Sequence, residues 1–189
     1  MIKRSATTNT AIRIPIDVYE KIEMQSISEG TNISSVINNI LRKYVTWDQF
    51  INDIGFIFLQ KPFLRTIFED IPETVIIKAA KTTCHAGMRD AISFIHGKID
   101  TNTIIDVVKL WLSSSNIPLR VIYDIEVLEF RIQHKLKKKG SLYFGTLLSS
   151  LFAELKIQPR KSILKDHTTI ISFNIKVEKN NDENKIISK

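Results

Sequence analysis

The sequence predicts an α+β protein with three parts: a strand followed by two helices, a mostly helical middle, and a C-terminal β-β-α-β unit. Two observations predict this class. Apolar and polar residues alternate with period two over residues 8–14 and again after Pro118, which is typical of strands. Between these stretches apolar residues recur at helical spacing, and prolines and glycines separate the segments.

The N-terminal strand is expected over residues 8–14. One face carries Thr10, Ile12 and Ile14, and the other carries Asn9, Ala11 and Arg13. Pro15 ends the strand because it has no N–H for a ladder.

Two helices follow the strand. Asp17 is predicted to cap the first, over residues 17–29, with Glu20 completing a capping box. Gly30 stands where a helix end needs a left-handed residue, and Asn32 is a suitable N-cap for a second helix over residues 33–45. The apolar face of this second helix consists of Ile33, Val36, Ile37, Ile40, Leu41 and Tyr44.

The middle of the chain is predicted to be helical. Pro62 opens a helix that runs to Asp70, Pro72 opens one that runs to about Gly87, and residues 88–96 continue it or start again. A further amphipathic helix covers residues 101–115. The apolar run over residues 55–59 is ambiguous between strand and helix.

The C-terminal unit begins after Pro118. Strands are expected over residues 119–123 and 127–132, a turn at residues 137–140, a helix over residues 141–155 and a last strand over residues 168–177. We therefore divide the chain into a flexible basic arm (1–7), a strand-helix-helix module (8–46), a helical plus α+β domain (47–177) and a polar tail (178–189).

Composition limits the class of protein further. The formal net charge of +7 favours a polyanionic partner, but the basic residues are concentrated in residues 131–165, so charge alone does not single out the N-terminus. Cys84 is the only cysteine, which excludes an intrachain disulfide. No apolar run is long enough to span a membrane, and we expect a cytoplasmic, nucleoid-associated protein.

The N-terminal module is expected to work as a homodimer or a higher assembly. A short strand exposes two unpaired edges, and two short helices do not enclose a core. Pairing of the strand with its twin buries Ile12 and Ile14 and leaves Asn9, Ala11 and Arg13 outside. Such a ribbon fits the major groove of double-stranded DNA, where Arg can bind guanine, Asn can bind adenine and Ala can pack on a thymine methyl.

Phosphate contacts are expected beside the ribbon. Free N–H groups at the start of the second helix, near Asn32, can hold a backbone phosphate, with Ser34 or Ser35 donating a hydroxyl hydrogen bond. Lys3 and Arg4 are assigned to an arm along the DNA backbone.

A family resemblance rests on three runs: Ile12-Arg13-Ile14-Pro15, then Asp17-Val18-Tyr19-Glu20-Lys21-Ile22, then Glu29-Gly30-Thr31-Asn32-Ile33-Ser34-Ser35-Val36-Ile37. Over residues 8–45 the chain resembles the ribbon-helix-helix repressors of the Arc type. The resemblance implies base reading by Asn9, Ala11 and Arg13 and phosphate binding by Asn32, Ser34 and Ser35. The chain departs from many members in carrying Ala11 at the central reading position.

The leading hypothesis is a sequence-specific transcriptional regulator whose residues 47–177 sense a small-molecule or protein effector or mediate oligomerisation. The alternative is an antitoxin-like protein whose C-terminal part binds a protein partner. A third hypothesis is a catalytic site that the sequence does not reveal. We expect no enzyme activity and no cofactor, because the sequence contains no recognisable nucleotide-binding loop or catalytic constellation.

Three further features are open to interpretation. The run Lys137-Lys138-Lys139 is either a solvated turn or a second nucleic-acid contact. Four histidines (His85, His96, His134 and His167) invite a metal hypothesis, but the spacing of Cys84, His85 and His96 fits no familiar ligand pattern, so we expect no metal. Residues 134–155 faintly resemble a domain of archaeal proteins of unknown function, and this resemblance implies no activity.

Overall fold

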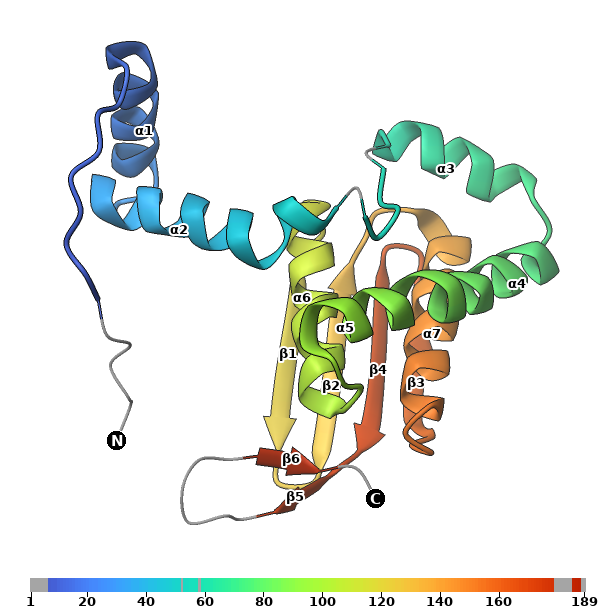
Figure 1. Cartoon of the computed structure of the whole chain (residues 1–189). Coiled ribbons are helices and arrows are strands. Elements are labelled where there is room, and N and C mark those ends of the chain that lie inside the picture. Colours follow the sequence, from blue (N-terminus) through green and yellow to red (C-terminus); the bar gives the residue numbers. More distant parts are fainter. Residues whose placement is uncertain (1–6, 52, 58, 179–184, 188–189) are drawn as a thin grey trace. The chain divides into compact units, whose positions relative to one another are not determined.

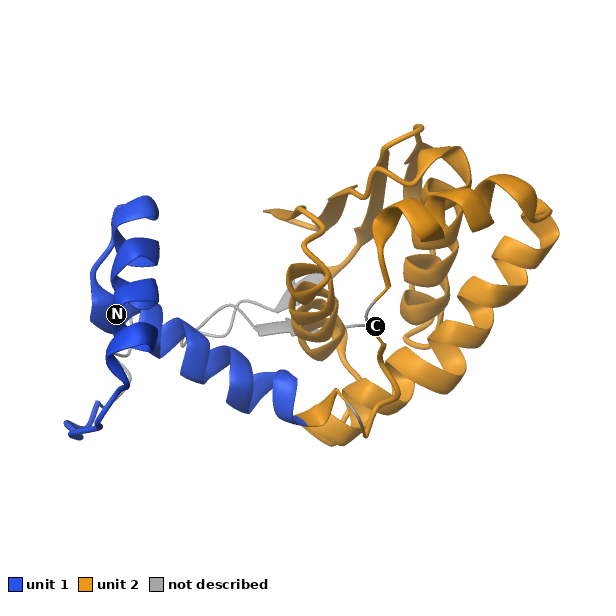
Figure 2. Cartoon of the chain, turned by 90° about the horizontal axis from the view of Figure 1, so that it is seen from above, with its two compact units in different colours: residues 1–49 blue, residues 50–189 orange. Residues whose placement is uncertain are grey.

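The computed structural model describes residues 7–51, 53–57, 59–178 and 185–187, and confirms the α+β class. The chain divides into two compact units (Figure 2), unit 1 over residues 1–49 and unit 2 over residues 50–189. The sequence analysis placed this boundary after residue 46. None of the described helices has the length and apolar character needed to cross a membrane.

Unit 1 consists of an extended segment and two helices (Figure 1). Helix α1 spans Ile16–Ser28 and helix α2 spans Ile33–Thr46, followed by a 3-10 turn at Asp48–Phe50. Residues 7–15 precede α1 without regular structure, so the strand expected over residues 8–14 is not formed in the single chain. The physical reason is that a ladder needs a second strand, and none pairs with these residues here.

The connection between α1 and α2 follows from two residues of the sequence. Gly30 has a φ of 62°; its N–H donates to the carbonyl of Ile27, and the N–H of Thr31 donates to that of Ser26. This is the Schellman pattern, which needs a left-handed residue. The side chain of Asn32 then accepts a hydrogen bond from the N–H of Ser35 at 2.8 Å. Both expected caps are therefore confirmed.

The start of α1 corrects one prediction. Pro15 is the N-cap residue, and its carbonyl accepts from the N–H groups of Val18 and Tyr19. Asp17 lies inside the first turn, and the capping box expected with Glu20 is absent from α1. Pro15 has the extended backbone conformation that an N-cap requires. Asp17 lies in the first turn, where its negative charge interacts favourably with the positive end of the helix dipole.

Unit 2 begins with a series of helices that matches the expected helical middle. They are α3 (Lys61–Asp70), α4 (Glu73–Thr83), a π-helical turn η2 (Cys84–Met88), α5 (Arg89–His96) and α6 (Thr101–Ser114). Figure 1 shows that α4, η2 and α5 run on without a break, so residues 88–96 continue the preceding helix. A capping box between Asp100 and Thr103 starts α6.

The C-terminal part of unit 2 forms an antiparallel sheet of four strands. These are β1 (Leu119–Asp124), β2 (Val127–Gln133), β3 (Pro159–Leu164) and β4 (Thr168–Asn174), in the spatial order β1-β2-β4-β3. In the register, Phe130 stands between Val121 on β1 and Ile171 on β4. Helix α7 (Lys137–Ala153) connects β2 to β3.

This arrangement corrects the predicted β-β-α-β unit, which lacks β3. Residues 159–164 contain Pro159, Arg160 and Lys161 at their start, so no apolar alternation marks them, and pairing with β4 makes them a strand. The expected last strand also breaks at Ile175. Lys176–Glu178 instead form β5, paired with β6 (Lys185–Ile187), in the segment assigned partly to a polar tail.

The core of unit 2 lies between the sheet and its helices. Phe130 on β2 and Phe173 on β4 are fully buried beside Phe152 of α7, and the rings of Phe152 and Phe173 stack with centroids 4.0 Å apart. Aromatic side chains of this size contribute most to the burial that stabilises a domain.

The expected turn at residues 137–140 is wrong, because these residues form the first turn of α7. The ammonium of Lys139 donates to the carbonyls of Glu69 and Ile71 at the end of α3, and Lys137 pairs with the Glu69 carboxylate. Gly140 is required for close packing, since a Cβ there would lie 2.5 Å from Cβ of Leu136. Two of the three lysines thus hold α3 to α7.

Candidate functional site

Unit 1 leaves most of its large apolar side chains in contact with solvent. Within α1 and α2 the buried residues are Ser26 and Val36 alone. Ile16 and Ile27 are 72% and 74% exposed. The other exposed large apolar residues of this unit are Ile12, Val18, Tyr19, Met24, Ile40, Leu41, Tyr44 and Val45. A single copy of unit 1 therefore does not enclose a core.

The residues expected to read bases lie in the extended segment that precedes α1. Asn9, Ala11 and Arg13 are all exposed, at alternate positions of residues 7–15. They lie in one extended segment, which does not pair with another strand in the described part of the chain. Lys3 and Arg4, the expected arm, lie outside the described residues.

The residues expected to hold phosphate gather at the start of α2. The Asn32 side-chain oxygen is engaged with the N–H of Ser35, so its amide NH₂ remains as a donor. Ser34 is exposed and Ser35 is half-buried. The first turn of α2 contains no acidic residue, so only the positive end of the helix dipole acts there.

A buried polar network in unit 2 contains His134. The N–H of Leu136 donates to Nδ1 of His134 at 3.0 Å, so Nε2 carries the proton and donates to Oγ of Ser141 at 2.8 Å. Ser141 in turn donates to the carbonyl of Lys165. Burial, and then the charge of His167, lower the pKa of His134 to about 4. This network joins β2, α7 and the β3–β4 turn, so the role of His134 is structural.

Cys84 offers no activated nucleophile. It lies in the π-helical turn η2, where burial and then the Glu154 carboxylate raise the pKa of its thiol to about 11. Only a thiolate is a strong nucleophile, and this environment disfavours it. No cluster of three or more His, Cys, Asp or Glu side chains that could hold a metal ion is present in the described part of the chain.

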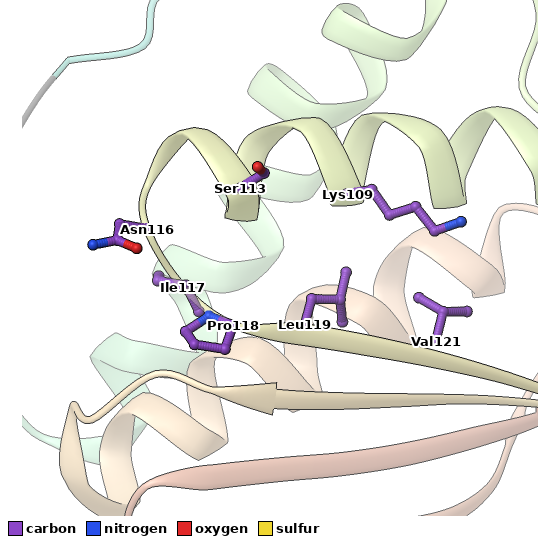
Figure 3. A pocket seen from close by; sticks show the side chains of 7 residues that line it. All are labelled: Lys109, Ser113, Asn116, Ile117, Pro118, Leu119 and Val121. Carbon is purple, nitrogen blue, oxygen red and sulfur yellow. The ribbon is translucent and has the colours of Figure 1, made fainter. Parts of the chain in front are cut away.

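In the described part of unit 2, a cavity of about 460 Å³ lies over α4 and η2, beside Lys78 and His85, and two others border α6. The smaller of these two, of about 430 Å³, lies between α6 and β1 (Figure 3), where Lys109 and Ser113 of the helix stand over Leu119 and Val121 of the strand. The larger, of about 580 Å³, is lined by the segment around Phe56, by α3 and η2, by the end of α6 and by α7.

The sequence analysis did not identify the larger cavity. The one signal for this cavity in the sequence was the apolar run at residues 55–59, which is ambiguous between strand and helix and in which Phe56 borders the cavity. Trp111 and Phe144 also line this cavity, and each belongs to a segment that the sequence predicts only as a helix.

Comparisons with protein-family models, with curated proteins and with solved structures find no match to this chain. The geometry of the two units is therefore the basis for assigning a function.

Proposed function

We propose that the protein is a sequence-specific DNA-binding transcriptional regulator that acts as a homodimer or higher assembly through a ribbon-helix-helix module in unit 1. The observation that carries this proposal is the exposure of the apolar side chains of α1, α2 and the segment before them.

Pairing with a second copy resolves this exposure. Two antiparallel copies of residues 8–14 satisfy each other's backbone N–H and C=O groups. The same association covers Ile12, which is 59% exposed, and the apolar sides of both helices. Burial of apolar surface contributes roughly 25 cal/mol per Å², so a face of this extent favours association.

The dimer then offers a two-stranded ribbon to the major groove. Asn9, Ala11 and Arg13 contact base edges, whereas Asn32, Ser34 and Ser35 hold a backbone phosphate, assisted by Lys3 and Arg4. Phosphate contacts of this kind make binding steeply dependent on salt concentration. In this proposal unit 2 senses an effector or mediates assembly rather than catalysing a reaction.

The association is tested by sedimentation equilibrium of the full chain. Ile12→Lys changes a side chain that contacts little within one chain, yet it places a charge in the proposed interface, and we expect a shift toward monomer. Ile125→Lys is the matched control, because Ile125 is 86% exposed in the β1–β2 turn. A monomeric wild type, or equal behaviour of both variants, contradicts the proposal.

The DNA contact is tested by selecting preferred sites from random duplexes and then comparing variants on the selected site. Arg13→Ala is expected to weaken preference for that site by roughly 1–3 kcal/mol, the worth of one bidentate base contact. Lys21→Ala, an exposed basic residue on α1, is the control. Unchanged site preference in the Arg13 variant argues against base reading by the ribbon.

A further inference from the structure

We propose that unit 2 binds an apolar carboxylate, an aliphatic or aromatic acid of small-molecule size, in its larger cavity. We call this space the α3–α7 cavity; it is bordered by Phe56, Lys61 and Phe68, by Gly87 of η2, by Trp111 of α6 and by Phe144 of α7. All of these residues lie in unit 2, so the proposal stands whether or not unit 1 binds DNA.

The size and walls of the cavity suit an apolar molecule. Its volume of about 580 Å³ falls in the range of ligand pockets, roughly 300–1,000 Å³. A series of aromatic rings forms part of the wall, with centroids 6.3 Å apart for Phe56 and Trp111 and 5.8 Å apart for Trp111 and Phe144. These walls would bury the apolar part of a ligand.

One part of the cavity carries positive charge. Lys61 is the single charged residue among the described lining residues, which include no Asp or Glu. It is half-buried at the first position of α3, where the positive end of the helix dipole adds to its charge. Ser114 and Ser115, also in the lining, supply hydroxyl groups.

The position of Lys61 is fixed by the protein. Its ammonium donates to the carbonyl of Asn116, at the end of α6. An ammonium has three N–H donors, so this bond leaves donors for a ligand. Asn116 has a left-handed φ of 50° and closes α6, since its N–H donates to the carbonyl of Ser113. A cation held by a helix end in this way is pre-positioned for a carboxylate.

The π-helical turn η2 forms another part of the cavity wall. Thr83, Gly87 and Met88 from this turn and its approach border the cavity. Gly87 has no side chain, and a Cβ there would meet only Cγ2 of Thr83, at 3.9 Å. π-helical turns within α-helices occur frequently at functional sites. Here the turn brings a glycine to the cavity, and the space beside that glycine is open.

Charge decides which class of head group fits best. A carboxylate gains an ion pair with Lys61, an alcohol gains only a neutral hydrogen bond, and an amine is repelled. We therefore expect the order acid, then alcohol, then amine among molecules with the same apolar part.

The test is calorimetric titration of the full chain with dodecanoate and dodecylamine below their critical micelle concentrations and with dodecanol below its solubility limit. Lys61→Met is expected to weaken binding of dodecanoate about tenfold and to leave dodecanol within about twofold. Lys138→Met, which removes an exposed lysine of α7 that is not in the lining, is expected to change neither. Gly87→Leu, which extends an isobutyl group into the cavity beside η2, is expected to weaken binding of dodecanoate and dodecanol alike.

Three results would overturn the proposal: absence of dodecanoate binding, equal affinity for the three head groups, or an equal loss of acid and alcohol in the Lys61 variant. If Gly87→Leu does not fold, as judged by circular dichroism, the acid-to-alcohol ratio in Lys61→Met still decides the matter. That ratio would not move if Lys61 only held α3 to the end of α6.

Discussion

The two units of this chain differ in how far they bury their large apolar side chains. In unit 2, Phe130, Phe152 and Phe173 are fully buried between a sheet and a helix. In unit 1, Ile16 and Ile27 lie in regular helices with most of their surface in solvent. The helices of the two units are of comparable length, so the difference does not lie in local structure.

This difference in burial follows from the length of each unit and from whether its elements can pack against one another within one chain. Folded chains below about 40 residues bury too small a fraction of their surface and usually need oligomerisation or another support. Residues 8–46 fall at this limit, whereas unit 2 is long enough to fold a sheet onto its own helices. From this contrast we expect unit 2 to be stable as a single copy, and under the proposed function unit 1 would complete its core by pairing with a second copy.

The strongest way to sharpen this contrast is Phe152→Ala. Removal of this ring from the stack with Phe173 is expected to lower the free energy of unfolding of unit 2 by about 3–5 kcal/mol. Hydrogen exchange of the β4 amides should report this loss equally at all protein concentrations. Phe63→Ala, at a position 53% exposed on α3, is the control and should change little. A loss that depends on protein concentration would contradict a single-copy core.

Acid is expected to weaken unit 2 next most strongly, through His134. The pKa of this imidazole is about 4 in the folded chain, against an ordinary value of 6.5, so the unfolded chain binds more protons between these values. The contribution of neutral His134 to the free energy of unfolding is therefore fully present above pH 6.5 and is lost as the pH falls toward 4. The loss amounts to about 3 kcal/mol. Urea unfolding across this pH range measures it.

A pair of variants isolates this titration. His134→Gln should remove the pH-dependent step, whereas His85→Gln, at an exposed position, should retain it. The same slope in wild type and His134→Gln would assign the acid sensitivity to other groups.

A smaller effect is expected at Gly140. A methyl group there must displace Leu136 or the His134 ring, whose Nδ1 would lie 2.9 Å from the new Cβ. Overpacking of this kind costs about 1–3 kcal/mol. Thermal unfolding should show the loss for Gly140→Ala but not for Gly87→Ala, because a Cβ at Gly87 fits in open space. Equal melting temperatures of the two variants would contradict the role of Gly140 in packing.

The smallest effect is expected in unit 1. Asn32→Ala removes the side-chain cap of α2 and is expected to cost about 1 kcal/mol. Faster hydrogen exchange in the first turn of α2 would report it, and raising the protein concentration should partly restore protection if unit 1 pairs with a second copy. Asn38→Ala, at an exposed position inside α2, is the control. No change on losing the cap would indicate that packing alone holds α2.

The candidate sites differ in how far they could be predicted. Asn9, Ala11 and Arg13 are exposed as expected, but the ribbon that would pair them needs a second chain, and one sequence cannot supply that geometry. The α3–α7 cavity brings Phe56 and Lys61 together with Trp111, about fifty residues further along the chain, and no pattern in the sequence predicts that contact.

The sequence by itself determined the features that depend on a few neighbouring residues. The left-handed Gly30, the Asn32 cap and the helices opened near Pro62 and Pro72 follow from the torsion angles and hydrogen-bonding groups of those residues.

Only the tertiary structure decided where distant segments meet. Strand β3 pairs with β4, Lys139 donates hydrogen bonds to carbonyls at the end of α3, and Gly140 is required because Leu136 and His134 approach it. Hydrogen bonding and close packing between remote residues leave no periodic signal in the sequence, since each partner is chosen by shape and position in the folded chain.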